Sequence, residues 1–200
     1  GRKVVGHRAN LNVGVSTFVP KPHTPFQWVP CDTPDKIHEK QMLLRRALKT
    51  NGVKLNWTDP KETLLEAWLS RGDRRLCPVI ESAWRKGARF DAWQDQFNFQ
   101  AWQEAFTENQ INPDFYSHRQ RNLDEVFPWD HINPGVRKSY LLEEYKNSLT
   151  ASLRADCREQ CYACGILPMF NELRRQFPGP EWKCPDVSPS SKQPSKSPVS

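Results

Sequence analysis

The sequence predicts an α/β chain in which one strand, or two, precedes a run of helices. Three observations support this fold class. Residues 11–19 alternate as a strand does, with branched side chains on every second position. A loop with three prolines follows at 20–25. From residue 34 to residue 149, apolar residues then recur at helical spacing between capping residues.

The predicted strand has two unlike faces. One carries only branched or apolar residues, namely Leu11, Val13, Val15, Thr17 and Val19. The other is mostly small or polar, with Asn12, Gly14, Ser16 and Phe18. Such a strand is expected to pack one face on helices, while the other face leaves room for a ligand.

The prolines of the following loop fix three backbone φ angles within six residues. We therefore expect a stiff loop that holds Lys21, His23 and Thr24 in place. Loops at the ends of strands carry binding groups in many α/β enzymes. A proline-rich surface turn without a function is the competing interpretation.

The helices are predicted from caps and apolar spacing. A capping residue followed by proline opens two of them, at Thr33-Pro34 and Asp59-Pro60. The predicted helices cover 34–50, 60–71, about 76–86, 98–106, a short turn at 112–113 and about 134–149, with a second strand-like run at 53–57. Their spacing places Trp68, Trp84, Trp93 and Trp102 in the core, together with Leu69 and Ile80.

Other aromatic and sulfur-containing residues lie outside the helical stripes. Trp28 and Trp129 fall in predicted loops, so they are the tryptophans considered for ligand contact. Cys31 and Cys77 have no clustered partner, and we expect them to be packing residues.

Length and composition limit the class of protein. Two hundred residues suffice for one ordinary domain, whereas a full (β/α)8 barrel takes about 250. Residue 1 is Gly, and we interpret the chain as the downstream part of a longer protein. No window approaches the ~20 apolar residues of a membrane span, so we expect no membrane partner and a cytoplasmic location. The tail, 185–200, is rich in Ser, Pro and Lys and is expected to be disordered.

The net charge of +6 comes from 29 basic and 23 acidic residues that are interspersed. This pattern is more typical of a solvated surface than of a nucleic-acid-binding block.

Three of the six cysteines crowd into eight positions as Cys157, Cys161 and Cys164, a C-x3-C-x2-C spacing. Six cysteines are too few for a disulfide scaffold, and this crowding suggests thiolate ligands in a reducing compartment. Thiolates in a loop can converge on one metal or one iron–sulfur cluster. The same spacing would also place three buried structural thiols on one face of a helix.

One stretch, FVPKPHTPFQW at 18–28, resembles the segment that closes the catalytic barrel of cobalamin-binding radical S-adenosylmethionine (radical SAM) proteins. The similarity covers roughly residues 8–166. It continues in the same order through RGDRR at 71–75, GARFDAW at 87–93, PWDHI at 128–132 and DCR at 156–158. Five separated motifs in order are more specific than any one of them.

This resemblance implies the last strand or strands of a partial (β/α) barrel at 1–30, a helical extension at 31–150 and a cysteine-containing segment at 151–184. It implies reductive cleavage of S-adenosylmethionine at a [4Fe–4S] cluster, with cobalamin available for methyl transfer. The core cluster loop and the cobalamin domain would precede Gly1 and be partners of this chain. A pocket for cofactor or substrate would be lined by Ser16, Phe18, Lys21, His23 and Thr24.

Radical SAM enzymes bind their core cluster with the same C-x3-C-x2-C spacing. In the family, however, that loop follows the first barrel strand and has an aromatic residue directly before the third cysteine, where this chain has Ala163. We therefore expect an auxiliary site for a second cluster or for zinc at the triplet. Cys184, twenty residues further on, is the candidate fourth ligand.

A rival hypothesis needs no enzyme. In it, the chain is a zinc-binding helical module whose basic surface contacts RNA. Under the radical SAM hypothesis, the sequence does not identify the substrate; RNA and protein are the candidates.

Overall fold

A computed structural model describes residues 2–6, 10–180 and 183–185. The chain divides into two compact units, 1–128 and 129–200. The predicted segments 1–30 and 31–150 are not separated in this way, because the loop after the first strand is bonded to later helices. The predicted disordered tail lies outside the described residues from 186 onward.

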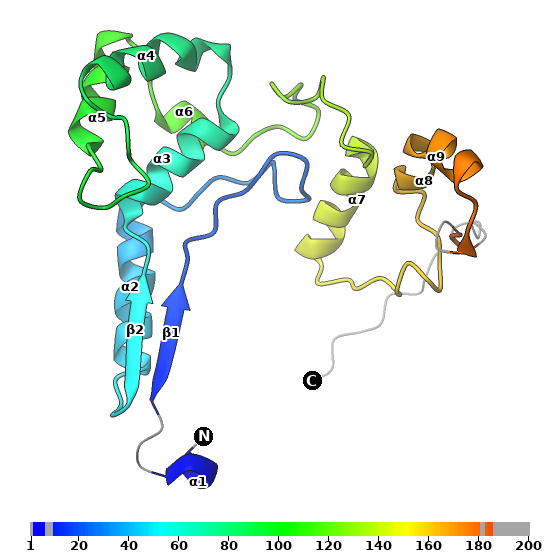
Figure 1. The fold of residues 1–200 in the computed structure, drawn as a ribbon, viewed down its shortest axis with the longest axis horizontal. Coiled ribbons are helices and arrows are strands. Elements are labelled where there is room, and N and C mark those ends of the chain that lie inside the picture. The colour runs from blue at the N-terminus through cyan, green and yellow to red at the C-terminus, as the bar shows by residue number, and fades with distance from the viewer. Residues whose placement is uncertain (1, 7–9, 181–182, 186–200) are drawn as a thin grey trace. The chain divides into compact units, whose positions relative to one another are not determined.

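The first unit begins with a short helix, α1 (Arg2–Val5), and a parallel pair of strands. β1 (Leu11–Val15) pairs with β2 (Val53–Trp57) in the register Leu11↔Val53 to Val15↔Trp57. Figure 1 shows both arrows pointing the same way, with α2 (Pro34–Ala47) alongside them as the connecting helix. The α/β class and both strands are thus confirmed. The first strand is shorter than predicted because its partner ends at Trp57.

The two faces of this sheet differ as the alternation predicts. Val13 and Val15 of β1 and Leu55 of β2 are half-buried, whereas Asn12, Gly14, Lys54 and Asn56 are exposed. No described atom lies within 4 Å of the position that a Cβ of Gly14 would occupy. One face of the parallel pair is therefore open and polar.

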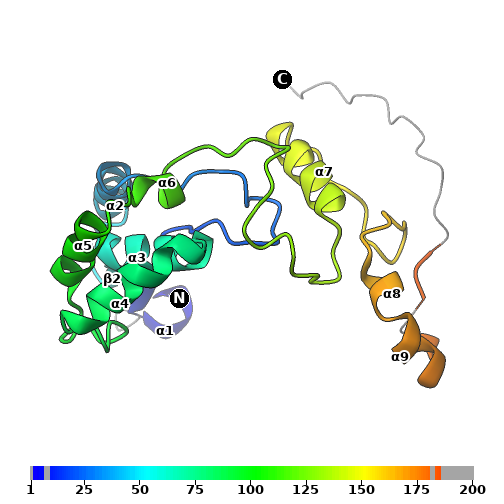
Figure 2. The same cartoon turned by 90° about the horizontal axis from the view of Figure 1, so that it is seen from above.

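The helices of the first unit follow their predicted caps. They are α3 (Pro60–Arg71), a 3-10 turn (Arg74–Leu76), α4 (Cys77–Arg85), α5 (Phe99–Glu108) and α6 (Asp114–Ser117). The capping side chains of Thr33, Asp59 and Asn98 accept backbone amides, as their residue types favour. Helices α4 and α5 pack side by side (Figure 2).

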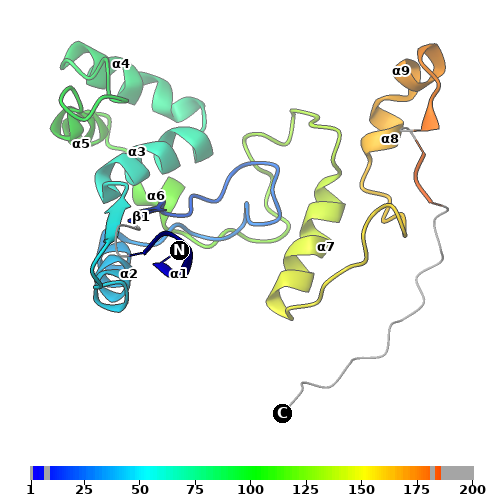
Figure 3. The same cartoon turned by 60° about the horizontal axis from the view of Figure 1, so that its bottom comes forward.

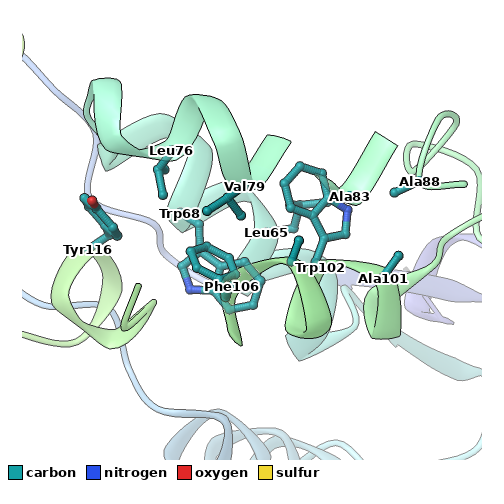
Figure 4. Packing of buried hydrophobic residues seen from close by; sticks show 11 residues of the cluster. Leu65, Trp68, Leu76, Val79, Ala83, Ala88, Ala101, Trp102, Phe106 and Tyr116 are labelled. Atoms are coloured by element: carbon teal, nitrogen blue, oxygen red, sulfur yellow. The ribbon is translucent and has the colours of Figure 1, made fainter. Parts of the chain in front are cut away.

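The core of the first unit lies among α3, α4 and α5 (Figure 4). Trp68 stacks on Phe99 at 5.7 Å between ring centroids and meets the edge of Phe106 at 4.8 Å. Trp102 is buried and donates its indole N–H to Asp91. The predicted core positions of Trp68 and Trp102 are confirmed.

The predicted core positions of the other two tryptophans are wrong, because Trp84 and Trp93 are exposed by 53% and 61%. Trp28 and Trp129, which were considered for ligand contact, are buried. The covered stripe of α4 is narrow, so Trp84 lies beside it under the guanidinium of Arg89.

Two further predictions from spacing are wrong, because Leu69 of α3 and Ile80 of α4 are exposed. Cys77, expected to be a packing residue, is exposed as well, whereas Cys31 is buried. Spacing identifies a helix face, but it does not show how much of that face another element covers.

The second unit contains α7 (Lys138–Leu149), α8 (Ile166–Met169) and α9 (Asn171–Gln176). Figure 3 shows an extended segment leading from α7 to α8. Helix α7 begins four residues later than predicted, because Gly135 has a φ of 84° and Arg137 is extended. Leu141 and Tyr145 of α7 are buried. None of the described helices is long and apolar enough to cross a membrane.

Candidate functional site

The loop after β1 is ordered by its own hydrogen bonds. The Thr24 hydroxyl donates to the Lys21 carbonyl at 2.7 Å, and the His23 amide donates to the side-chain oxygen of Gln27 at 3.2 Å. His23 itself has a φ of 56°, a conformation that non-glycine residues adopt rarely. The loop is thus a defined structure at the carboxyl end of a parallel strand, where α/β proteins place ligands.

The side chain of Arg71, the last residue of α3, anchors this loop through hydrogen bonds. Its side chain is fully buried and donates to the carbonyls of Pro20 at 2.8 Å, Val29 at 2.9 Å and Tyr116 at 3.1 Å. Burial lowers the pKa of Arg71. One guanidinium therefore joins both ends of the loop to α6, using the five-donor geometry that only arginine has.

Two further arginines, Arg119 and Arg121, lie near Arg71. Arg121 is buried and contacts the Arg71 carbonyl, and burial together with the charges of Arg71 and Arg119 lowers the pKa of Arg121 to about 10. Arg119 binds both oxygens of Glu125, and this pairing lowers the pKa of Glu125. These side chains border a cavity of about 200 Å³.

The five predicted pocket residues occupy different environments. Ser16 and Phe18 are exposed, and the Phe18 ring meets Phe26 edge-on at 5.6 Å. Lys21 forms an ion pair with Glu66 of α3.

His23 and Thr24 are half-buried. Among the described residues, His23 Nε2 is buried without a hydrogen-bond partner. A buried ring nitrogen of this kind calls for a polar group that the described residues do not provide.

Two residues that organise the loop were missed from the sequence. Gln27 and Arg71 are buried polar residues, at 1% and 0% exposure, and both hold loop backbone groups. Arg71 stands in the quoted RGDRR motif with the exposed Arg74 and Arg75. The motif differs at Arg71 only in that this arginine ends a predicted helix just before glycine, which does not indicate burial.

The cysteine triplet lies in irregular backbone and not in a helix, with Cys157 in a turn. The interpretation that places three structural thiols on one helix face is therefore wrong. In the turn Cys161–Gly165, the Ala163 amide donates to Cys161 Sγ at 3.4 Å. Ala163 and Gly165 have positive φ angles of 53° and 108°. This turn folds the backbone around the first sulfur of the C-x2-C pair.

The turn is fixed to the start of α7. The Arg137 amide donates to the Cys164 carbonyl at 2.8 Å. At Gly165 a Cβ would come within 2.8 Å of the Gly135 carbonyl, so only glycine fits this approach. The Arg154 guanidinium lies 4.6 Å from the centre of the Tyr162 ring within the turn.

The fourth cysteine, Cys184, is exposed. Partial desolvation and the charges of Cys161, Cys164 and Cys157 raise the pKa of its thiol. All four are free cysteines. Among the described residues, however, no three Cys, His, Asp or Glu side chains are already gathered closely enough to hold a metal ion.

Comparison with models of known families, with curated proteins and with solved structures found no match for this chain.

Proposed function

We propose that this chain is the C-terminal part of a radical SAM protein, contributing a strand pair and the pocket loop to a parallel barrel. The observation that carries the proposal is the parallel β1/β2 pair with one open, polar face. Parallel sheets occur almost only with both faces covered or closed into a barrel. A two-stranded sheet is also too small to be stable alone. Further strands would complete it.

The loop supplies the second support. In such a barrel, Asn12, Gly14 and Ser16 would face the interior, and the loop at 18–28 would lie at its carboxyl end, where barrel enzymes bind their ligands. The buried His23 Nε2 would meet a polar group of the cofactor or substrate there. Phe18, Lys21 and Thr24 would border the same pocket.

Core radical SAM chemistry is not assigned to the cysteines of this chain. In the family, the core cluster loop follows the first barrel strand and has an aromatic residue directly before the third cysteine, whereas this triplet lies at 157–164 and has Ala163 there. We therefore do not place the core cluster at the triplet. Under the proposal, the core [4Fe–4S] cluster, the S-adenosylmethionine site and any cobalamin site belong to the preceding domains, and the whole protein works in the cytoplasm.

The proposal is tested by the coding sequence in front of Gly1 and by the protein it encodes. That sequence should contain a second C-x3-C-x2-C loop, and the longer protein, reconstituted anaerobically with iron and sulfide, should cleave S-adenosylmethionine. His23→Ala should lower turnover in the longer protein, and His38→Ala, at an exposed position of α2, should not. Absence of the second cysteine loop, or full activity of the 200 residues alone, would contradict the proposal.

RNA binding by a zinc-containing helical module is the second candidate function. Its specific support is a group of exposed aromatic side chains, Trp84, Phe90 and Trp93, with Arg89 stacked on Trp84 at 5.0 Å. Nearby basic groups are already paired, since Arg85 binds Glu81 and Lys86 faces Glu104 and Glu108. This candidate predicts single-stranded RNA affinity that falls steeply with salt and is weakened by Trp93→Ala.

A further inference from the structure

The cavity of about 200 Å³ in the first unit has a lining with more positive than negative charge. Among the described residues that line it, four are arginines and two are carboxylates, namely Arg71, Arg75, Arg119, Arg121, Asp73 and Glu125. Four positive charges against two negative ones leave a formal excess of two. Residues 16–24 are not among the described residues of this lining, so a role for the cavity goes beyond the proposed function.

Two of the four arginines lie inside the protein. Arg71 and Arg121 are exposed by 0% and 2%. The three hydrogen-bond acceptors of the Arg71 side chain are neutral carbonyls. Arg121 Nη1 lies 3.5 Å from Glu125 Oε1, but Arg119 already binds both oxygens of this carboxylate, at 2.7 Å and 2.5 Å. One carboxylate is thus shared by two guanidiniums, and buried charge is costly unless an opposite charge balances it.

The two outer arginines are held in place beside the cavity. The guanidinium carbons of Arg119 and Arg75 lie 4.3 Å and 5.0 Å from the centre of the Phe115 ring. Towards described residues, Arg75 uses two of its five side-chain N–H groups, both on Asp73, and Arg119 uses three. Each therefore has donors for a further acceptor. The Arg75 side chain is 57% exposed, so a ligand can reach it from solvent.

The charge excess and the size of the cavity together indicate a class of ligand. A dianion would balance the excess of two charges. A phosphate monoester carries a charge of about −1.5 to −2 at pH 7 and offers three acceptor oxygens, which arginine binds in pairs. A phosphodiester carries only one negative charge. Pockets for drug-sized ligands measure about 300–1,000 Å³, so this smaller cavity suits a phosphate group with at most a small substituent.

We propose that this cavity binds inorganic phosphate or the phosphate group of a small monoester. In this arrangement Arg75 and Arg119 donate hydrogen bonds to the phosphate oxygens, and Arg71 and Arg121 contribute buried positive charge. The bound dianion also stabilises the first unit, because it binds the folded chain and not the unfolded one.

Isothermal titration calorimetry of the 200-residue chain tests the proposal, with ionic strength held constant by chloride. The probes are inorganic phosphate, phenyl phosphate and dimethyl phosphate. We expect one site for the first two, and binding of the singly charged dimethyl phosphate that is at least about tenfold weaker. Phenyl phosphate binding at least as tightly as inorganic phosphate identifies the monoester as the ligand, and weaker binding identifies the free ion.

Three variants connect the binding to this cavity. Arg75→Gln should weaken phosphate binding about 10- to 100-fold, because it removes a hydrogen bond between charged groups. The matched control is Arg74→Gln, at an exposed arginine outside the described lining, which should keep the parent affinity. Glu125→Gln removes a competing negative charge and should strengthen phosphate binding at least about fivefold, which a purely structural ion pair does not predict.

Arg75 is exposed, so Arg75→Gln is expected to fold, and circular dichroism checks this for each variant. Four results would overturn the proposal. They are no phosphate binding above the chloride background, equal affinity for dimethyl phosphate, equal losses in Arg75→Gln and Arg74→Gln, or weaker phosphate binding by folded Glu125→Gln.

Discussion

Two irregular segments of this protein, the loop at 18–31 and the cysteine segment at 156–165, are held in different ways. Each contains a non-glycine residue with positive φ, His23 in the first and Ala163 in the second. In the loop, backbone carbonyls receive bonds from a fully buried arginine. The cysteine segment is exposed or half-exposed, with no buried residue in it. Buried backbone groups of an irregular segment need hydrogen-bond partners, and in the loop the Arg71 guanidinium supplies them. An exposed segment can leave its backbone groups bonded to water.

The largest expected effect comes from removing the buried guanidinium. Arg71→Met should lower the free energy of unfolding of the first unit by about 3–5 kcal/mol, because three buried carbonyls lose their donor. Arg71→Lys should restore little of this, since an ammonium cannot reach three acceptors in a plane. Denaturant unfolding measures both. Arg74→Met, at an exposed neighbour, is the control and should stay within about 0.5 kcal/mol of the parent. An equal loss in both variants would show that the loop does not depend on Arg71.

Replacing either of two glycines of the first unit by alanine should change stability less than the loss of Arg71, and the two sites can be compared directly. At Gly72 a Cβ would lie 2.2 Å from Leu76 Cδ1 and 2.8 Å from the Trp68 carbonyl, so Gly72→Ala should cost about 1–3 kcal/mol. At Gly14 the same methyl would meet no described atom within 4 Å. Gly14→Ala should therefore be neutral or stabilise by about 0.5–1 kcal/mol. Thermal unfolding of the two variants checks this, and a large loss at Gly14 would mean that the open face of the sheet is covered.

The smallest effect is the pH dependence caused by the Arg119–Glu125 pair. Arg119 lowers the pKa of Glu125 in the folded protein. The ion pair therefore contributes fully to stability above pH about 4.3, which is the pKa of a glutamate in the unfolded chain. This contribution is lost as the pH falls through the lower pKa of Glu125 in the folded protein. Glu125→Gln should flatten this part of the profile of unfolding free energy against pH. The control Asp124→Asn, at an exposed neighbour, should keep the parent profile; identical profiles for parent and Glu125→Gln would exclude the pair as the cause.

Local chemistry made much of the fold predictable. Caps such as Thr33-Pro34 and Asp59-Pro60 place helix starts through bonds within a few residues, so α2 and α3 begin where the sequence indicates. The strand at 53–57 was predicted from the alternation of apolar and polar residues within it, and β2 covers the same residues. By contrast, the burial of Trp28 and the exposure of Trp84 depend on which distant elements cover them. Periodicity carries no such information.

The candidate sites were predictable to different degrees. The cysteine set was predicted from spacing alone, and a metal or cluster bound by Cys157, Cys161, Cys164 and Cys184 stays a prediction, because the described residues do not gather three such ligands. The role of Arg71 was not predictable, because its acceptors lie up to 51 positions away. The function of the loop residues Ser16, Phe18, Lys21, His23 and Thr24 stays a prediction.

Hydrogen exchange in the parent and in Arg71→Met tests the contrast between the two segments most directly. In Arg71→Met, amides of the loop, such as that of Cys31 bonded to the Ser117 carbonyl, should lose protection by at least about tenfold. Amides of residues 156–165, including the Ala163 amide that bonds Cys161, should keep the protection they have in the parent. If Arg71→Met changes neither segment, or exposes both equally, the two segments are not held by different means.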